Sequence, residues 1–158
     1  MKKLCIFTLI FILCDQLIKI LITDNLVEYQ YIDIIKNLFV ITHVHNTGAA
    51  FSILLNNVPL LIGISLIALV LLYFYIIRKS ELTKLNILIY SLLLGGIIGN
   101  LIDRLIHGYV IDYLSFRVFK YNFPIFNLAD IGIVVAVILL CLKTFKEEVC
   151  KKSLSKKM

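Results

Sequence analysis

Residues 85–106 read LNILIYSLLLGGIIGNLIDRLI, and this stretch decides the class of fold. It has the length of about 20 residues that an α-helix, rising ~1.5 Å per residue, needs to cross a ~30 Å hydrocarbon core. Yet it contains Asn100, Asp103 and Arg104. Because a charged group at membrane depth costs about 2.5–3.5 kcal/mol on insertion scales, a helix that keeps such residues is expected to hold a polar site.

Three other apolar stretches are long enough to span a bilayer, at residues 4–23, 58–77 and 125–142. The chain of 158 residues is 61% hydrophobic and 16% charged, with a mean hydropathy of +0.98. This composition is too apolar for a soluble domain of that length. We therefore predict an α-helical integral membrane protein with four transmembrane helices, forming a single membrane-embedded domain over residues 1–158.

Two longer segments connect these helices on one side of the membrane, at residues 24–57 and 108–124. In the first, the run LFVITHVH at 38–45 is rich in β-branched and aromatic residues and begins to alternate. This pattern predicts a strand or small sheet lying on the membrane face. The second segment is rich in tyrosine and phenylalanine, a composition typical of the membrane–water interface.

Lysine and arginine are distributed unevenly between the two sides of the predicted membrane domain. With the amino terminus inside, eleven lie on the inner side, namely Lys2, Lys3, Arg78, Lys79, Lys84, Lys143, Lys146, Lys151, Lys152, Lys156 and Lys157. Three lie in the outer segments, namely Lys36, Arg117 and Lys120. The positive-inside rule therefore places both termini in the cytoplasm. The net charge of +6 follows from this topology, and no nucleic-acid partner is predicted.

Charged residues close together in the helices are first interpreted as structural ion pairs. Asp15 and Lys19 lie four residues apart on the first helix, so they share one face and can pair. Asp103 and Arg104 are neighbours on the third helix and could form a second pair of this kind. Each pair would neutralise charges that the bilayer cannot solvate.

The third helix also carries a polar stripe, which must contact protein or water rather than lipid. Its members are Gly96, Asn100, Asp103, Arg104 and His107. Gly95 and Gly99 add a small-xxx-small pattern that lets another helix approach closely. Together these features predict a tightly packed polar core around the third helix.

Two further acids are expected to meet at one membrane level. Asp112 lies just past the outer end of the third helix, and Asp130 lies near the outer start of the fourth. If the third helix continued as far as Asp112, Asp103 would lie about 13 Å deeper. Two carboxylates brought together can share a proton, so that one acts as a general acid and the other as a general base.

Such a pair can activate water against an amide, and neither a metal nor a cofactor is predicted. In the alternative interpretation, Asn127 or Asp130 merely caps the fourth helix. Position alone leaves these two interpretations evenly balanced.

Five short blocks resemble, in order and spacing, those of the bacterial lipoprotein signal peptidases, or signal peptidase II family. They are DQLIK at 15–19, NTGAAFS at 46–52, GNLIDR at 99–104, VIDY at 110–113 and FNLAD at 126–130. The resemblance implies a four-helix membrane aspartic peptidase with an extracytoplasmic β-cradle, located in the bacterial cytoplasmic (inner) membrane. Its implied partners are membrane lipid and diacylglyceryl-modified prolipoproteins, which it would cleave before the lipid-bearing cysteine, acting as a monomer.

The resemblance also assigns roles to residues. It implies that Asp112 and Asp130 are the catalytic pair. Supporting polar positions fall on Asn46, Asn100, Arg104 and Asn127, and further matching positions fall on Asp15, Lys19 and Asp103. The chain departs from the family pattern at Ile111, Tyr113 and Ile131, and the last change could remove a hydrogen bond near the pair.

A second class of function is a proton- or ion-coupled membrane carrier, in which buried acids form a relay. Against this alternative, the acids of the third and fourth helices gather toward one face of the membrane instead of crossing it. Replacing Asp112 would discriminate the two, because a carrier would lose flux and a peptidase would lose cleavage.

Overall fold

The computed structural model describes residues 1–36, 38–49, 53–118 and 121–155. Its helices are α1 (Lys2–Asn25), α2 (Val58–Leu71), α3 (Lys84–His107) and α4 (Leu128–Ser155), and α2 is extended by a π-helical turn (Leu72–Ile76) and a 3-10 turn (Ile77–Lys79). Its strands are β1 (Tyr31–Ile35), β2 (Phe39–Asn46), β3 (Val110–Val118) and β4 (Tyr121–Asn122). Part of the NTGAAFS block, residues 50–52, lies outside the described residues, as do Lys120, Lys156 and Lys157.

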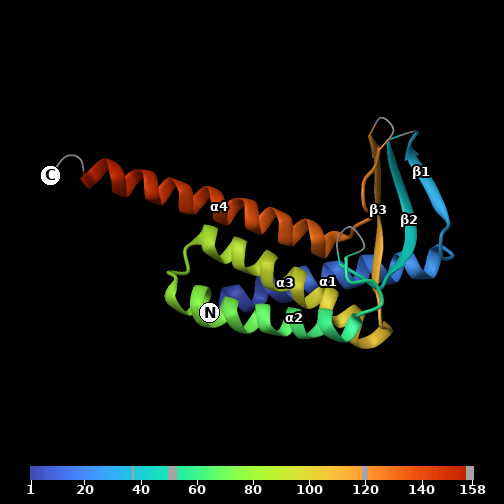
Figure 1. Ribbon diagram of the computed structural model, residues 1–158, viewed down its shortest axis with the longest axis horizontal. Helices are drawn as coiled ribbons and strands as arrows, with labels where there is room; N and C mark the ends of the chain where they lie inside the picture. Colours follow the sequence, from blue (N-terminus) through green and yellow to red (C-terminus); the bar gives the residue numbers. More distant parts are fainter. Residues whose placement is uncertain (37, 50–52, 119–120, 156–158) are drawn as a thin grey trace.

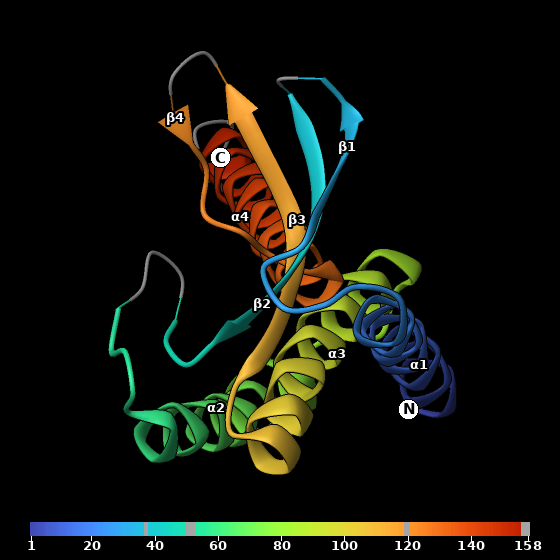
Figure 2. The same ribbon diagram turned by 90° about the vertical axis from the view of Figure 1, so that its right-hand side faces the viewer.

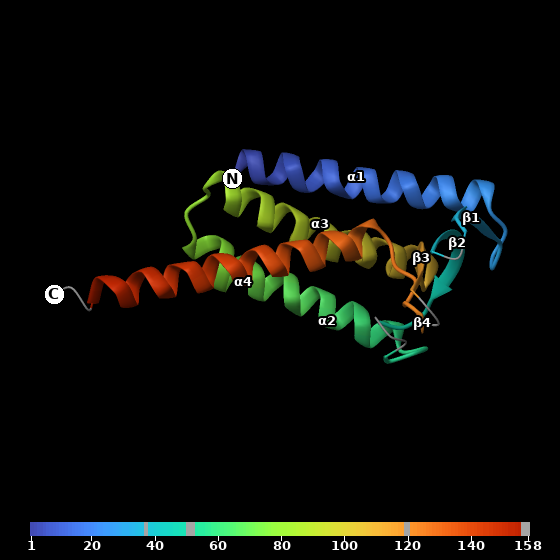
Figure 3. The same ribbon diagram turned by 90° about the horizontal axis from the view of Figure 1, so that it is seen from above.

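The prediction of a four-helix membrane protein is confirmed. Four segments have the length and apolar composition to cross a bilayer, namely Lys2–Asn25, Val58–Lys79, Lys84–His107 and Leu128–Val149. The helix α3 contacts each of the other three, and Figure 3 shows it lying between α1 and α2. This central place explains how α3 can carry polar residues, because its polar side chains face protein rather than lipid.

Glycines on α3 permit this close packing. A Cβ atom at Gly99 would lie 2.7 Å from the Asp15 carboxylate of α1, and one at Gly96 would lie 2.5 Å from the Ala129 carbonyl oxygen of α4. Both distances are too short for a side chain. The predicted small-residue pattern therefore brings α1 against one side of α3, while Gly96 brings α4 against the other.

The strands form an antiparallel sheet in the order β1-β2-β3-β4 at one end of the helices. Figure 1 shows both chain termini toward the opposite end, and Figure 2 shows β3 running from the end of α3 past the start of α4. The strand predicted at 38–45 is present as β2. The segment 108–124, interpreted only as an aromatic interface, in fact contains β3, whose residues Leu114 to Val118 alternate in polarity.

Two predictions are wrong because of where helices begin and end, namely the start of the fourth helix and the depth of Asp103 relative to Asp112. The fourth helix begins at Leu128 instead of residue 125, since Phe126 still pairs with Leu114 of β3. The third helix stops at Gly108, whose left-handed φ of 78° reverses the chain. Asp112 therefore does not lie about 13 Å from the level of Asp103: the Ile111 N–H donates to Asp103 Oδ2 at 3.1 Å.

Candidate active site

Asp112 is held on strand β3 with only 2% of its surface exposed. In the register of β2 and β3, Val44 lies opposite Asp112, which puts Asn46 diagonally beside it on the same face. Asn46 Nδ2 donates to Asp112 Oδ2 at 2.8 Å, and Asn127 Nδ2 donates to Asp112 Oδ1 at 2.7 Å. Both carboxylate oxygens therefore accept a bond from a neutral amide.

Asp130 lies in the first turn of α4, and Asn127 is the N-cap of that helix. Asn127 Oδ1 accepts from the Asp130 N–H at 3.0 Å, and Asp130 Oδ2 accepts from the Asn127 N–H at 3.3 Å. This reciprocal arrangement is a capping box. The other oxygen, Asp130 Oδ1, accepts from Asn100 Nδ2 of α3 at 2.8 Å. Capping thus occupies one oxygen of Asp130 and leaves the carboxylate at the wall of a cavity.

The two acids line the same cavity, which has a volume of about 520 Å³. Its polar wall consists of Asn46, Asn100, Arg104, Asp112 and Asp130. The rest is mainly apolar, formed by Ala49, Val110, Phe123, Pro124, Ile125, Phe126, Ile131, Ile133, Val134 and Val135. Asn127 joins the pair directly, because its side chain bonds Asp112 while its backbone N–H bonds Asp130. The site therefore presents two carboxylates at one end of an apolar cavity.

Burial raises the pKa of Asp112 to about 7, and the negative charge of Asp130 adds to the rise. The hydrogen bonds from Asn46 and Asn127 and the charge of Lys19 oppose it. Asp112 can consequently hold a proton near neutral pH. A carboxyl group in that state can serve as a general acid.

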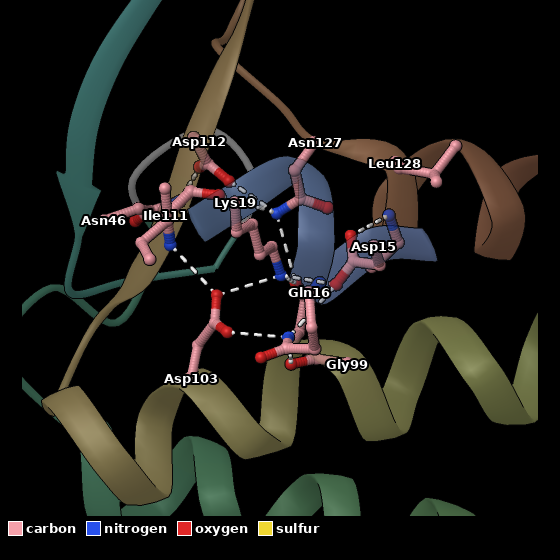
Figure 4. Close-up of polar contacts among 12 residues, drawn as sticks. Asp15, Gln16, Lys19, Asn46, Gly99, Asp103, Ile111, Asp112, Asn127 and Leu128 are labelled. Atoms are coloured by element: carbon pink, nitrogen blue, oxygen red, sulfur yellow. Dashed lines mark hydrogen bonds and ion pairs between the residues drawn. The ribbon is translucent and has the colours of Figure 1, made fainter. Parts of the chain in front are cut away.

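A second buried cluster, formed by Asp15, Lys19 and Asp103, lies close to Asp112 and Asn127 (Figure 4). Lys19 Nζ lies 2.8 Å from Asp15 Oδ2 and 2.9 Å from Asp103 Oδ2. All three side chains are at most 1% exposed. Asp15 and Lys19 thus form the ion pair that their spacing predicts. The proposed pairing of Asp103 with Arg104 is not what the structure has, because Asp103 contacts Lys19 and accepts a bond from Gln16 Nε2 at 3.0 Å.

Arg104 faces the cavity from α3 and is half-buried. Its guanidinium Nη2 donates to the Gly48 carbonyl at 3.2 Å, which ties α3 to the loop after β2. Its Nε is buried and, among the described residues, has no hydrogen-bond partner. His107, the last member of the predicted stripe, stacks on Tyr109 instead of entering the cavity.

The sequence interpretation did not assign Tyr113 to the site, although its hydroxyl group helps to hold the start of α4. The Tyr113 hydroxyl accepts from the Leu128 N–H at 3.0 Å, while Asp15 Oδ1 accepts from the Ala129 N–H at 2.9 Å. With Asn127 bonding Asp130, the first three N–H groups of α4 all have side-chain acceptors. The only signal for Tyr113 was its place beside Asp112. Among the described residues, no cluster of three His, Cys, Asp or Glu side chains is placed to hold a metal ion.

The fold and the site define a membrane-embedded protein with two carboxylates, one buried and one partly buried, in a cavity at one end of its helices. Comparison with known proteins identifies its family. Residues 7–146 match the family described as signal peptidase (SPase) II. The chain therefore belongs to the signal peptidase II family of membrane aspartic peptidases.

Curated relatives agree with this assignment. The chain is 41% identical over 145 residues to a lipoprotein signal peptidase of Halothermothrix orenii, covering 90% of this chain and 95% of the relative. It is 43% identical over 131 residues to a lipoprotein signal peptidase of Clostridioides difficile, covering 81% and 84%.

Solved structures agree as well. Two bacterial membrane enzyme structures determined by the in meso method, at 2.3 and 1.9 Å resolution, superpose with TM-scores of 0.86 and 0.82. Both are 29% identical in sequence, and the alignments cover 94% and 92% of this chain and 90% and 94% of those structures. The resemblance found in the sequence is thereby confirmed, and the carrier alternative receives no support.

Proposed function

We propose that this protein removes the signal peptide of diacylglyceryl-modified prolipoproteins by cutting the peptide bond just before the lipid-bearing cysteine, with Asp112 and Asp130 as its catalytic pair. The observation that carries the proposal is the arrangement of these two carboxylates, which come from different elements, share Asn127 as a partner and line one apolar cavity. Membership of the signal peptidase II family supports the type of reaction.

The chemistry needs one proton shared by the pair. The ionised carboxylate accepts a proton from a water molecule as the water oxygen attacks the carbonyl carbon of the scissile bond. The protonated carboxyl group donates its proton to the carbonyl oxygen, which gives a tetrahedral intermediate. When this intermediate collapses, the C–N bond breaks, the leaving nitrogen takes a proton from one acid, and the other acid accepts a hydroxyl proton from the intermediate, which restores the shared proton. The signal peptide gains a carboxyl terminus, and the cysteine gains a free amino group.

The surrounding amides suit this task. Asn46 and Asn127 orient Asp112, and Asn100 orients Asp130, without adding a charge that would fix either protonation state. In this proposal Arg104 steadies negative charge that develops on the substrate carbonyl oxygen, since a fixed donor aimed at developing charge is often a large catalytic contribution. The Arg104 side chain lines the cavity together with both acids, which supports this role.

The location of the site supports a substrate that spans the membrane. The cavity lies where α4 meets the sheet, and both chain termini lie toward the opposite end of the helices. Together with the charge bias, this arrangement supports cytoplasmic termini and a site near the outer face of the bacterial cytoplasmic membrane. A signal helix could then cross the bilayer beside α4, with its lipidated cysteine at the level of the acids. We propose that the active unit is a monomer, because one chain supplies both acids.

The test is cleavage of a lipidated prolipoprotein by the purified protein in detergent, with product size read on a gel. We expect Asp112→Asn and Asp130→Asn each to abolish cleavage while the protein stays folded and inserted. Asp33→Asn is the matched control, because it removes an exposed carboxylate on β1 and should leave turnover unchanged. Near-normal turnover in either site variant would show that the assigned pair is wrong.

A further inference from the structure

The two residues that immediately precede the proposed catalytic acids are held in the same way. The backbone N–H of Ile111, before Asp112, donates to Asp103 Oδ2 at 3.1 Å. The backbone N–H of Ala129, before Asp130, donates to Asp15 Oδ1 at 2.9 Å. Each catalytic acid therefore follows a residue whose backbone is fixed by a buried carboxylate from another helix.

A single cation holds both of these carboxylates. Lys19 Nζ lies within 2.9 Å of an oxygen of Asp15 and of Asp103, and it also donates to Asn100 Oδ1 at 3.2 Å. The last bond, together with one from Asn127 Nδ2 to the same oxygen at 3.1 Å, fixes which way the Asn100 amide points. With its oxygen toward Lys19, Asn100 directs its Nδ2 group to Asp130 at 2.8 Å. Three separate connections thus lead from one ammonium group to the pair, and Figure 4 shows the one through Asp103 to the Ile111 N–H.

We propose that Lys19 is a positioning residue, which sets the relative placement of Asp112 and Asp130 through Asp103, Asp15 and Asn100. This inference rests on the proposed function of the two acids. It differs from the simple interpretation of Lys19 and Asp15 as a structural pair, because it assigns the cluster a defined effect on turnover by molecules that are fully folded.

The two interpretations give different kinetics. Lys19, Asp15 and Asp103 do not line the cavity, so the cluster makes no contact with a substrate bound there. Loss of positioning should lower kcat and leave KM unchanged. A structural role would reduce only the amount of folded protein and leave kcat per folded molecule as it is.

A pH profile supplies a second distinction. The charges that face Asp112 are those of Asp130 and Lys19, and Arg104 lies close enough to interact with both acids. Because the positive charge of Lys19 opposes the rise in the pKa of Asp112, its removal should move the activity profile to higher pH. Loss of folded protein alone would lower the whole profile without moving it.

The experiment compares Lys19→Met with Lys143→Met in the prolipoprotein assay, using only the monodisperse fraction from size exclusion. Lys143 is a matched control, because it too donates to a buried asparagine, Asn86 Oδ1 at 2.7 Å, but at the opposite end of α3. We expect Lys19→Met to lower kcat by about 100-fold, which is the effect of a displacement of about 1 Å. KM should stay unchanged, and the pH profile of activity should move to higher pH. Lys143→Met should match the wild type.

If Lys19→Met yields no folded protein, variants of Asp103 decide the question. Asp103→Asn keeps an oxygen that can accept from the Ile111 N–H, whereas Asp103→Ala removes the acceptor and leaves Lys19 paired with Asp15. Positioning predicts that the Asn variant keeps most of kcat and that the Ala variant loses about as much as Lys19→Met.

The proposed function and the positioning role fail in different ways. A wild-type protein that does not cleave, or an Asp112→Asn variant that does, contradicts the proposed function. The positioning role alone is overturned if the wild-type protein cleaves and Lys19→Met leaves both kcat and the pH profile unchanged. It is also overturned if the wild-type protein cleaves and Asp103→Ala leaves kcat unchanged.

Discussion

Gly96 sets how closely α4 can approach α3, and Gly96→Ala offers a direct test of the site's geometry. A Cβ atom there would lie 2.5 Å from the Ala129 carbonyl oxygen and 2.7 Å from Ile133 Cγ1. Ordinary van der Waals contact begins at 3.4 Å, so the backbone of α4 must withdraw by about 0.9 Å. Ala129 directly precedes Asp130, and the shift would move this acid relative to Asp112.

The size of the effect follows from two opposing contributions to stability. Overpacking costs about 1–3 kcal/mol, whereas alanine in place of glycine inside a helix gains about 0.5–1 kcal/mol. The net loss of stability should therefore be at most about 2.5 kcal/mol. A misplacement of about 1 Å can cost about 100-fold in rate, which corresponds to roughly 2.7 kcal/mol. Activity should consequently fall more clearly than the unfolding temperature.

The assay measures kcat on lipidated prolipoprotein and the thermal unfolding midpoint in detergent for the same preparations. Gly63→Ala is the control, because a Cβ atom at Gly63 of α2 would have no neighbour within 4 Å. We expect Gly63→Ala to be as active as the wild type and slightly more stable. If Gly96→Ala kept wild-type kcat, the contact between α3 and α4 would not set the geometry of the acids, and the reasoning would fail.

Three further outcomes are expected. Because burial raises the pKa of Asp112 to about 7, the pair loses its shared proton as pH rises. The value of kcat/KM should therefore decline about tenfold per pH unit above neutrality. A flat profile up to about pH 9 would contradict this prediction. Lys19→Ala should lower the free energy of unfolding by about 3–5 kcal/mol. Adding Asp15→Ala should recover only part of this stability, because Asp103 has also lost its partner. Normal stability of the single variant would refute this expectation. In a background without native cysteines, a cysteine at Lys36 should react with an impermeant thiol reagent in intact cells, whereas one at Lys84 should not, and labelling at Lys84 would overturn the orientation.

Much of the fold could be predicted because hydropathy along one chain suffices to find membrane helices. The predicted spans at 58–77 and 85–106 differ by at most two residues at each end from the membrane-spanning segments of the structure, Val58–Lys79 and Lys84–His107. Strand β3 was harder to recognise, because its first four residues, Val110 to Tyr113, are all buried and show no alternation. A strand covered on both faces lacks the period of two that would identify it.

The sequence predicts most residues of the candidate site, but it predicts fewer of the contacts between them. The expected depth of Asp103 depended on whether the third helix continued past its predicted end at residue 106, and the glycine after His107 is a recognisable signal that it does not. The partner of Asp103 could not be found from spacing, since Lys19 lies on a different helix. Sequence separation identifies contacts within a helix, whereas contacts between helices depend on which faces pack together.

The hydrogen bonds and ion pairs of the site also explain how a membrane protein can keep two acids close together. Asp112 is almost completely buried and Asp130 is partly buried, so their oxygens need donors from the protein. A cation bonded directly to either acid would favour its ionised form and remove the general acid. The structure instead places neutral amides of Asn46, Asn100 and Asn127 against the acids, and it holds Lys19 one layer behind them. In the mechanism proposed above, the cation thereby fixes the geometry, while the proton stays free to move between the acids and the substrate.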